Sequence, residues 1–391
     1  MVTVQEAKKL IHENCGSSKV EEISLIKSCG FILAEEVYAP IDTPPFDQSA
    51  MDGYAFSFDD WDKHADLKVT GEVQAGNYLL LELMPNQAVR IFTGAALPKG
   101  TDTVVMQEKV VLKDNHIHIE DDKIIKGSNV RLRASQTRKD AVVLNKNHLL
   151  TPASISFLAG IGIEKVKIFS QPTVSIIVTG KELIKPGQAI EEGKIYESNS
   201  FGLIAALEQL NIKPVSVDLV DDDEEQIRKI ISNRLQSEIL ILTGGVSVGD
   251  YDFVSSALEK CGVKKIFHKV KQKPGKPFYF GKFKDTLVFG LPGNPASVLT
   301  CFYEYVVNAV SSFTQKEYYE KLMLPLVNSY TKRPGLTYFL KGISNSENVT
   351  ILQHQESYMM DSYAQANCLI ELEEEREIFK QGEIVPVLKF I

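Results

Sequence analysis

The chain contains 391 residues, of which 44% are hydrophobic and 24% are charged, and its formal net charge is −8. This composition predicts a folded globular protein with several domains, because one hydrophobic core rarely serves so long a chain. The acidic balance argues against a nucleic acid partner, since the phosphate backbone favours basic surfaces.

Two other classes of protein are disfavoured by the residue pattern. No stretch approaches the roughly 20 apolar residues of a membrane span, and the start of the chain lacks the apolar core of a signal peptide, so we expect a cytoplasmic protein without a membrane partner. The five cysteines are widely spaced and contain no C-x-x-C pair. We therefore expect reduced thiols, and neither a disulfide framework nor a zinc site.

The chain is predicted to begin with a helix and to reach a module boundary near two prolines. Thr3 and Glu6 form a capping-box pattern ahead of apolar residues at helical spacing. A second apolar run, at 23–39, precedes Pro44 and Pro45, which favour an extended path. A boundary between modules is therefore expected there.

The next segments are predicted to be mainly β and then briefly helical. From about residue 54 to 130, short runs of alternating polar and apolar residues lie between turn residues, which is typical of strands. Thr151 then suits an N-cap, Pro152 the first position of a helix and Gly160 its end. We expect a β-rich insert followed by a short helix.

Residues 172–315 predict a doubly wound α/β domain. Apolar, β-branched runs alternate with helical segments, and strands such as ILIL at 239–242 are apolar at every position, as expected of parallel strands covered on both faces. The last stretch, about 322–391, lacks helical periodicity and contains turn signals. We expect a small β-barrel or sandwich there.

Four polar or glycine-rich loops follow the predicted parallel strands, and they share the carboxyl edge of the sheet, where ligands bind in such folds. One of these loops contains Gly244, Gly245, Ser247 and Gly249. Its backbone N–H groups can turn towards one point and cradle a phosphate, and the Ser247 hydroxyl is a further donor. A glycine-rich turn that is needed only for steric reasons is the alternative.

A second loop at this edge favours an anion through the helix that follows it. Asn294 suits the N-cap and Pro295 the first helical position, directly after Pro292 and Gly293. Free N–H groups and the helix dipole at such an amino end attract negative charge. A rigid strand-to-helix turn is the alternative.

A basic run lies between these loops in the sequence. An extended chain at 269–276 would place Lys269, Lys271 and Lys273 on one face, because side chains alternate along a strand. Three ammonium groups there would offset the repulsion between bound anions. A solvated lysine surface is the alternative.

Three carboxylates, Glu182, Asp222 and Asp252, occupy three different strand ends. This spacing is typical of hard-cation sites, in which Mg²⁺ binds a few carboxylates together with phosphate oxygens of a ligand. The alternatives are local, with Asp222 as the N-cap of a helix that begins near Glu224 and Asp252 as the cap of the next helix.

Seven segments of the sequence are specific enough to indicate a family. They are PPFDQSAMDGYAF at 44–56, IFTGAALPKGTDTVVMQE at 91–108, VTGKEL at 178–183, YESNS at 196–200, TGGVSVGDYDF at 243–253, KPGKPFYFG at 273–281 and GLPGNPAS at 290–297. With these segments the chain resembles, over nearly its whole length, the MoeA-type molybdopterin molybdenumtransferases and the related gephyrin E domain.

The resemblance implies a homodimer of four-domain chains. An elongated, helical dimerisation domain would comprise residues 1–45 and 137–171, a β-rich insert domain residues 46–136, the α/β molybdopterin-binding domain residues 172–318, and a C-terminal β-barrel domain residues 319–391. The active site would lie between subunits, with one subunit providing the α/β strand ends and the other the MDGY segment and the β insert. Other cofactor-biosynthesis proteins are further expected partners.

Together with the motifs above, the resemblance assigns site residues. The residues expected to act in catalysis are Asp52, Glu182, Asp222, Asp252, Lys269 and Lys273, of which Glu182, Asp222 and Asp252 would bind Mg²⁺. The residues expected to bind the substrates are Thr93, Arg131, Gly244, Gly245, Ser247, Gly249, Lys276, Pro292, Gly293, Asn294, Pro295 and Ser357. The chain departs from the family pattern at Ala134-Ser135-Gln136, which replaces a glycine and acidic residues, and at Lys181, where a small polar residue is commoner.

The implied reaction converts adenylylated molybdopterin and molybdate into molybdenum cofactor and AMP. Lysines and backbone amides would hold the pyrophosphate, Mg²⁺ would polarise the bond that is cleaved, and Asp52 would order an attacking oxygen. Arg131, Lys269, Lys273 and Ser357 are the candidates for binding tetrahedral molybdate. The alternatives are the preceding step, in which AMP is transferred to molybdopterin, and a non-catalytic gephyrin-like scaffold.

Overall fold

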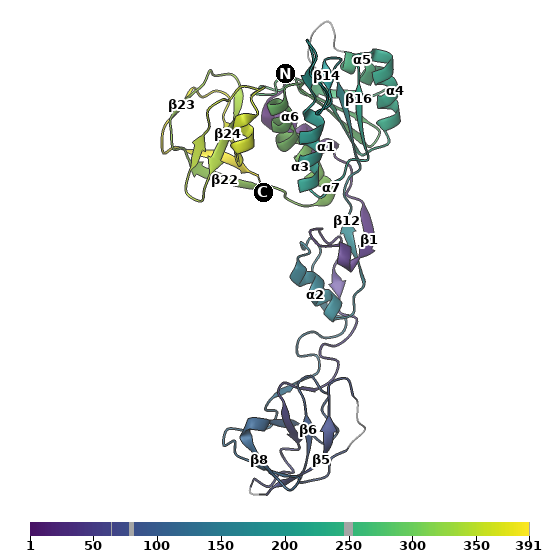
Figure 1. Ribbon diagram of the computed structural model, residues 1–391, viewed down its shortest axis with the longest axis vertical. Helices are drawn as coiled ribbons and strands as arrows, with labels where there is room; N and C mark the ends of the chain where they lie inside the picture. The colour runs from purple at the N-terminus through teal and green to yellow at the C-terminus, as the bar shows by residue number, and fades with distance from the viewer. Residues whose placement is uncertain (64, 78–81, 246–252, 391) are drawn as a thin grey trace. The chain divides into compact units, whose positions relative to one another are not determined.

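A computed structural model describes residues 1–63, 65–77, 82–245 and 253–390 (Figure 1). The chain divides into two compact units, unit 1 with Met1–Glu21 and Phe169–Ile391, and unit 2 with Glu22–Ile168. Unit 2 is thus inserted between the first helix and the rest of unit 1. No helix within the described ranges combines the length and the apolarity that crossing a bilayer requires.

A six-stranded sheet forms the centre of unit 1. Its strand order is β16-β13-β17-β21-β20-β18, and the first four strands are parallel whereas β20 and β18 run antiparallel to their neighbours. The strands are β13 Val174–Thr179, β16 Ser216–Val220, β17 Ile239–Thr243, β18 Lys264–His268, β20 Tyr279–Phe283 and β21 Thr286–Leu291. The predicted parallel sheet is confirmed, with an antiparallel edge added to it.

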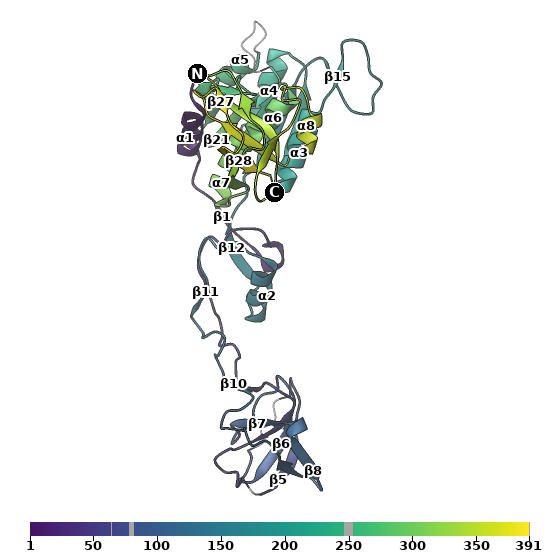
Figure 2. The same cartoon turned by 90° about the vertical axis from the view of Figure 1, so that its left-hand side faces the viewer.

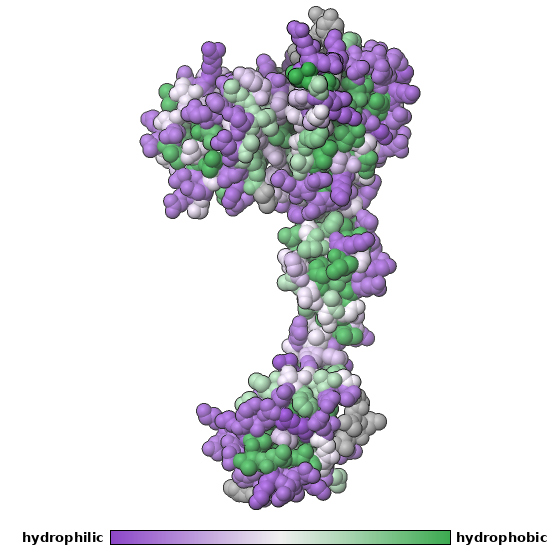
Figure 3. Space-filling model, viewed as in Figure 1, coloured by the Kyte–Doolittle hydropathy of each residue, from purple (hydrophilic) through white to green (hydrophobic). Residues whose placement is uncertain are grey.

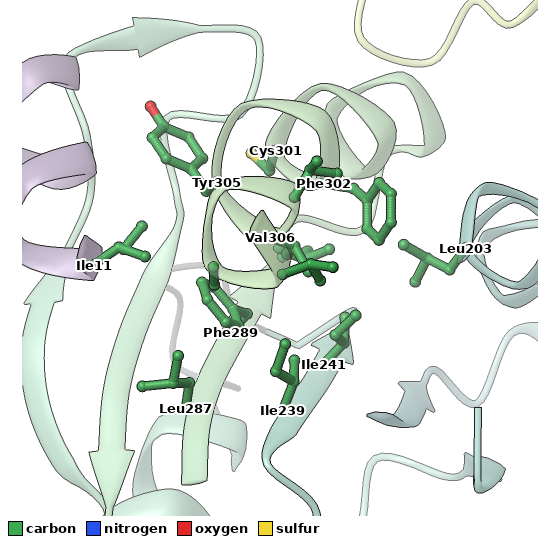
Figure 4. Close-up of a cluster of buried hydrophobic side chains, with 14 of the residues drawn as sticks. Ile11, Leu203, Ile239, Ile241, Leu287, Phe289, Cys301, Phe302, Tyr305 and Val306 are labelled. Atoms are coloured by element: carbon green, nitrogen blue, oxygen red, sulfur yellow. The ribbon is translucent and has the colours of Figure 1, made fainter. Parts of the chain in front are cut away.

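Helices cover both faces of this sheet, as predicted for a doubly wound domain. They are α1 Val4–Asn14, α3 Asn199–Gln209, α4 Glu224–Arg234, α5 Phe253–Lys260, α6 Pro295–Cys301, the π-helical turn η3 Phe302–Val306 and α7 Val307–Thr314. Ile176 of β13 packs in the core that contains α1, α3, α6 and α7, while the next residue, Ile177, packs in the core that contains α4 and α5. Figure 4 shows the first core, where Ile241 lies near Phe302 and Val306. Burial of each such side chain stabilises the fold by about 1.5–3 kcal/mol.

Local sequence signals determine where several helices begin. The Thr3 hydroxyl accepts a hydrogen bond from the Glu6 N–H, and the Glu6 carboxylate accepts one from the Thr3 N–H, so the predicted capping box is confirmed. Asn294 is the N-cap residue of α6 and Pro295 its first residue, as predicted. These positions suit the free N–H groups at the start of a helix, because proline has none to lose.

The C-terminal part of unit 1 is β-rich, as predicted. Its main sheet has the order β19-β24-β26-β28-β22, and β25 pairs with β24. The elements of this part are β22 Glu320–Pro325, β23 Tyr330–Thr331, β24 Thr337–Ser344, β25 Val349–Ile351, α8 Asp361–Gln365, β26 Cys368–Leu372, β27 Ile378–Phe379 and β28 Ile384–Lys389. Leu326, the residue after β22, forms a parallel bridge with Val349 of β25, so the β22 end of the sheet is linked back to β24 and the strands close on themselves as in the predicted barrel.

One strand of this C-terminal sheet comes from the α/β part of the chain. β19, Gln272–Lys273, lies between β18 and β20 in the sequence but pairs in parallel with β24 through Gln272 and Thr337. The central sheet and the C-terminal sheet are therefore connected by backbone hydrogen bonds as well as by packing.

A second excursion leaves the central sheet between β13 and α3. β14 Leu183–Ile184 and β15 Ile195–Tyr196 form a separate two-stranded parallel sheet. Figure 2 shows this segment extending from the sheet with β15 in its return arm. Because it begins directly after Glu182, it places that residue at the base of a solvent-exposed arm.

Unit 2 contains a second six-stranded sheet, with the order β7-β4-β6-β5-β9-β8. The elements are β3 Gln48–Ser49, β4 Gly53–Phe56, β5 Leu67–Val73, β6 Gln87–Ile91, β7 Thr103–Met106, the 3₁₀ turn η2 Gln107–Lys109, β8 Val110–Lys113, β9 His116–Ile119 and β10 Val130–Arg131. Ala55 and Val104 pack in one core and Tyr54 and Val105 in another, as alternation along strands requires. The predicted β-rich insert is confirmed.

The rest of unit 2 is less helical than the sequence led us to expect. It contains η1 Leu25–Lys27, β2 Val37–Tyr38, β11 Val142–Leu144 and one α-helix, α2 Pro152–Gly160, while β1 Val20–Ser24 and β12 Lys165–Phe169 span the boundary between the units. Thr151 caps α2 as predicted. The other expected helix, α1, belongs to unit 1 and packs in its core through Ala7 and Ile11.

Apolar side chains reach the surface in this part of unit 2. Figure 3 shows hydrophobic residues exposed around α2. The exposed large apolar residues of residues 22–46 and 137–168 are Ile26, Tyr38, Ile41, Phe46, Val142 and Leu149. A concentration of such residues is typical of a surface that binds another protein.

Candidate functional site

Four loops line up along the carboxyl edge of the central sheet in unit 1. The strands β16, β13, β17 and β21 are parallel neighbours, and they end at Val220, Thr179, Thr243 and Leu291. The predicted common edge is therefore confirmed. Ligands of open α/β sheets bind outside this edge.

Two of the predicted carboxylates lie on either side of one turn. The Lys181 N–H donates to Asp222 Oδ2 at 3.5 Å, and Glu182 Oε1 lies 3.0 Å from the position that a Cβ on Gly180 would occupy. The N-cap of α4 is Asp223, whose side chain accepts from the Gln226 N–H at 2.8 Å. The alternative role of Asp222 as the N-cap is therefore wrong by one residue, and its carboxylate is not needed for capping.

Two of the three carboxylates of the predicted magnesium site lie within the described residues. No group of three or more His, Cys, Asp or Glu side chains in those residues is placed to hold a metal ion. Mg²⁺ is commonly bound by one or two carboxylates together with phosphate oxygens, so Glu182 and Asp222 stay candidate ligands. The third predicted ligand, Asp252, lies outside the described residues.

The start of the glycine loop after β17 has room only for glycine. Gly244 has φ +89° and Gly245 has φ +59°, and a Cβ on Gly244 would lie 2.1 Å from the carbonyl oxygen of Thr179. The close contact with β13 therefore requires glycine at position 244 for steric reasons. This agrees with the alternative that the turn is rich in glycine for steric reasons. Ser247 and Gly249 lie outside the described residues.

An amide connects the loops after β17 and β21. Asn199, the first residue of α3, donates from Nδ2 to Thr243 Oγ1 at 3.0 Å and to the carbonyl oxygen of Gly293 at 2.8 Å, and Thr243 Oγ1 donates to the carbonyl oxygen of Pro292 at 2.9 Å. We did not predict this role for Asn199. The sequence feature that could have indicated this role is the position of Asn199 in the YESNS segment at 196–200.

A cavity of about 590 Å³ lies beside the loop after β21. Among the residues that line it are five of the predicted site residues, Lys273, Lys276, Pro292, Asn294 and Ser357. The lining also contains aromatic and apolar residues, including Tyr330, Leu336, Tyr338 and Phe339. The structure thus brings together residues of the α/β part and of the C-terminal part that are far apart in the sequence.

The lysines of the basic run do not share one face. Lys269 has φ +76°, so the chain is not extended there, and Lys269 does not line the cavity. Lys271 Nζ forms an ion pair with Glu374 Oε1 at 2.6 Å. Lys273 lies on β19 with its ammonium 5.2 Å from the centre of the Tyr338 ring. The prediction of one extended lysine face is therefore wrong, because a turn precedes β19.

The amino end of α6 offers fewer donors than we predicted. Pro295 has no N–H, and the Ala296 N–H donates to the carbonyl oxygen of Ser357 at 3.1 Å. The Asn294 side chain does not cap the helix but donates from Nδ2 to Ser357 Oγ at 2.7 Å. This end of α6 therefore binds the loop that contains Ser357, in addition to lining the cavity.

In unit 2, the structure brings together Asp52 and Thr93. The N–H and the hydroxyl of Thr93 both donate to Asp52 Oδ1, at 2.8 and 2.7 Å. These hydrogen bonds lower the pKa of Asp52, the backbone bond most. Asp52 is therefore an exposed, ionised acceptor whose orientation is fixed by the FTGA loop.

Arg131 and the departure that follows it both pair with the segment at 44–48. Arg131 is exposed on β10, opposite Gln48 of β3. Ala134 has φ +59°, and its N–H donates to the carbonyl oxygen of Pro44 at 2.9 Å. The left-handed conformation explains why the family pattern has glycine at this position, since glycine adopts it without strain.

We predict that Gly244→Ala destabilises the protein more than Gly187→Ala does. Both glycines have nearly the same φ, +89° and +91°, but a Cβ on Gly187 meets no atom within 4 Å. Gly187→Ala should therefore cost about 1–2 kcal/mol for the left-handed backbone alone, and Gly244→Ala about 2 kcal/mol more for the displaced backbone of β13. Urea denaturation of both variants measures the difference, and equal losses would contradict the steric argument.

We also predict that Thr93→Val raises the pKa of Asp52 without restoring the usual value, because the hydroxyl donor is lost while the N–H donor remains. Because folding lowers this pKa, the hydrogen bonds stabilise the fold above the unfolded pKa, and this stabilisation is lost as the pH falls through the folded pKa. An NMR titration of the Asp52 carboxyl carbon measures the shift. Thr101→Val, which removes a hydroxyl that donates to Pro98, should leave the titration unchanged.

Comparison with known proteins agrees with this arrangement along the whole chain. Residues 2–162 match the MoeA N-terminal region (domain I and II), residues 175–312 match a probable molybdopterin binding domain, and residues 324–390 match the MoeA C-terminal region (domain IV). A molybdopterin molybdenumtransferase of Haemophilus influenzae is 34% identical over 100% of this chain and 99% of its own length. One from Nostoc is 38% identical over 73% of this chain and 67% of its own length.

A solved structure shares the fold. The molybdopterin biosynthesis MoeA protein of Pyrococcus horikoshii is 29% identical, covers 100% of this chain and 99% of its own, and superimposes with a TM-score of 0.86. The match therefore extends through both units and is not limited to the α/β part. The chain belongs to the MoeA family.

Proposed function

We propose that this chain is a molybdopterin molybdenumtransferase, which inserts molybdate into adenylylated molybdopterin and releases AMP. The observation that carries the proposal is the cavity that joins Lys273 and Lys276 to Ser357 beside the carboxyl edge of the sheet. The full-length relative of Haemophilus influenzae bears the same enzyme name and supports it.

The cavity has the chemistry that a tetrahedral dianion needs. Lys273 and Lys276 are exposed and form no ion pair in the described part of the chain, so their ammonium groups remain available to an anion. Ser357 also lines the cavity, and its hydroxyl adds a neutral donor. Hydrogen bonds from ammonium groups to an oxoanion are about twice as strong as neutral ones.

The same cavity has a surface suited to a flat heterocycle. Its volume of about 590 Å³ falls within the range of small-molecule sites, roughly 300–1,000 Å³. Tyr330 contributes an aromatic ring on which the pterin would stack. The Tyr338 ring is instead in contact with the Lys273 and Lys332 ammonium groups. We propose that the dithiolene end of the substrate faces Lys273 and Lys276.

The glycine loop and the carboxylates would hold the AMP half of the substrate. Gly244 and Gly245, with Ser247 and Gly249 further along the loop, would donate to phosphate oxygens. Glu182 and Asp222, with Asp252, would bind Mg²⁺, which when bound neutralises phosphate charge and polarises the bond that is cleaved. The side chains of this chain thereby position the pyrophosphate beside the molybdate.

We further propose that a homodimer completes the site. Asp52, Thr93 and Arg131 of one subunit would face the strand ends of the other, as the family resemblance implies. The exposed apolar residues around α2 support this proposal, because burial in a dimer would remove them from water. The cytoplasmic location and contacts with other cofactor-biosynthesis proteins remain predictions from the sequence.

Reconstitution tests the function directly. Purified protein is incubated with adenylylated molybdopterin, molybdate and Mg²⁺, and we expect AMP and molybdenum cofactor in equal amounts, detected by mass analysis. Removal of Mg²⁺ with a chelator should stop AMP release. Formation of adenylylated molybdopterin from ATP and metal-free molybdopterin would instead support the preceding step, and binding without any turnover would support a scaffold.

The neighbouring aspartates provide a matched pair of variants. We predict that Asp222→Ala abolishes AMP release but leaves stability nearly unchanged, because its side chain caps no helix. Asp223→Ala should show the reverse, with a loss of about 1 kcal/mol of stability and normal turnover, because Asp223 caps α4. Thermal denaturation and the AMP assay separate the two effects, and full activity of Asp222→Ala would refute its assignment.

A further inference from the structure

We infer that Lys341 is a positioning residue of the molybdate site, which it serves by orienting the loop that contains Ser357; this inference rests on the proposed function. Lys341 lies on β24 and is 2% exposed. It does not line the cavity, so it acts through residues 354–359 and not by contact with the anion.

The Lys341 ammonium binds three carbonyl oxygens of this loop. Nζ donates to the carbonyl oxygens of His354 at 2.6 Å, Met359 at 3.1 Å and Glu356 at 3.3 Å. An ammonium group has three N–H donors, and each can be paired with one of these acceptors. Carbonyls from both ends of the loop therefore converge on one cation.

The backbone of the same lysine binds the loop a second time. The Lys341 N–H donates to Gln355 Oε1 at 2.9 Å, and Gln355 Nε2 donates to the Lys341 carbonyl oxygen at 2.9 Å. One residue of β24 thus holds the loop through its side chain and through both of its backbone groups. The loop cannot shift along the strand without breaking several hydrogen bonds at once.

These contacts determine how Ser357 faces the cavity. The Glu356–Ser357 peptide bond is trans, so the Ser357 N–H points away from the Glu356 carbonyl oxygen. That carbonyl oxygen accepts from Lys341. On the other side, Asn294 donates to Ser357 Oγ and Ala296 donates to the Ser357 carbonyl oxygen. The Ser357 hydroxyl acts only as an acceptor among the described residues, and its own proton is available to an oxoanion.

Among the residues that the structure describes, the Lys341 ammonium is buried without a counter-ion. Burial lowers the pKa of Lys341, against the opposing effect of Asp361 and Glu356. In the described residues Lys341 forms no ion pair, and the Asp361 carboxylate contacts His354 instead. The three hydrogen bonds offset the cost of burying this charge, and the three carbonyl oxygens of the loop would lose them if an apolar residue replaced Lys341.

A second buried lysine in the same domain is the matched control. Lys332 is 4% exposed, and its Nζ donates to the carbonyl oxygens of Leu336 and Glu374, each at 2.9 Å. Burial lowers its pKa as well. Lys332 contacts Leu336 and the Tyr338 ring, which line the cavity, but not residues 354–359. Its replacement therefore removes a buried cation that contacts the same cavity lining without releasing that loop.

The test compares Lys341→Met with Lys332→Met in the reconstituted reaction. Both variants should melt at lower temperature than the wild type, but only Lys341→Met should raise the KM for molybdate, by about tenfold, with kcat changed by less than about threefold. Hydrogen exchange of residues 354–359 should accelerate only in Lys341→Met. Equal KM values and equal exchange rates in the two variants would overturn the inference.

A double variant tests whether Lys341 acts through Ser357. The KM for molybdate of Lys341→Met/Ser357→Ala should equal that of Ser357→Ala, because the orientation of the loop has no value once the hydroxyl is absent. If the rise in KM of the double variant equals the product of the rises in the two single variants, Lys341 does not act through Ser357. If Lys341→Met does not fold, Lys341→Arg keeps the buried charge and permits the same comparison with a smaller expected rise in KM.

The inference and the proposed function fail in different ways. A wild-type protein that releases no AMP in the presence of molybdate contradicts the proposed function. A wild-type protein that turns over normally, together with a KM for molybdate in Lys341→Met that matches Lys332→Met, contradicts only the role of Lys341.

Discussion

The pairing of β19 with β24 is the interaction on which the cavity depends. Two residues, Gln272 and Lys273, leave the α/β part of the chain and join the edge of the C-terminal sheet. Gln272 is fully buried, and its amide donates to the carbonyl oxygen of Pro274 at 3.0 Å and accepts from the Tyr305 hydroxyl. A buried amide must keep such partners, so the path of this segment is closely specified. Lys273 is thereby directed to the cavity wall.

A partly buried ionic cluster also joins these two parts of unit 1. Lys8 of α1 contacts Glu304 in the π-helical turn at 2.6 Å and Glu371 of β26 at 3.7 Å. Burial raises the pKa of Glu371, and the neighbouring Glu304 adds to this effect, whereas Lys8 opposes it. For Lys8, the two carboxylates outweigh burial and raise its pKa. Removing one member would leave a partly buried charge without its partner. Apolar packing also holds α1 in unit 1, through Val4, Ala7 and Ile11.

The C-terminal part therefore does more than close the cavity. Its strand β24 provides the edge for β19, the aromatic wall through Tyr338 and, through Lys341, the support for the loop of Ser357. The amino end of α6 completes this arrangement, since Asn294 and Ala296 bind Ser357 from the α/β side. Hydrogen bonds such as that between Asn294 and Ser357 therefore connect segments about sixty residues apart in the sequence at this side of the cavity. Hydrogen bonds in such a network strengthen one another.

Periodicity and capping residues in the sequence were sufficient to predict the parallel sheet, its common loop edge, the starts of α1, α2 and α6, and the β-rich insert, because these features depend on neighbours within a few residues. The conformation of Lys269, the choice of Asp223 over Asp222 as a cap, the occupied donor of Ala296 and the role of Lys341 were decided by the tertiary structure. Each of these depends on a partner distant in the sequence or on a shift of a single residue in register. Local patterns do not contain that information, since pairing between distant strands is selected by the packing of the whole domain.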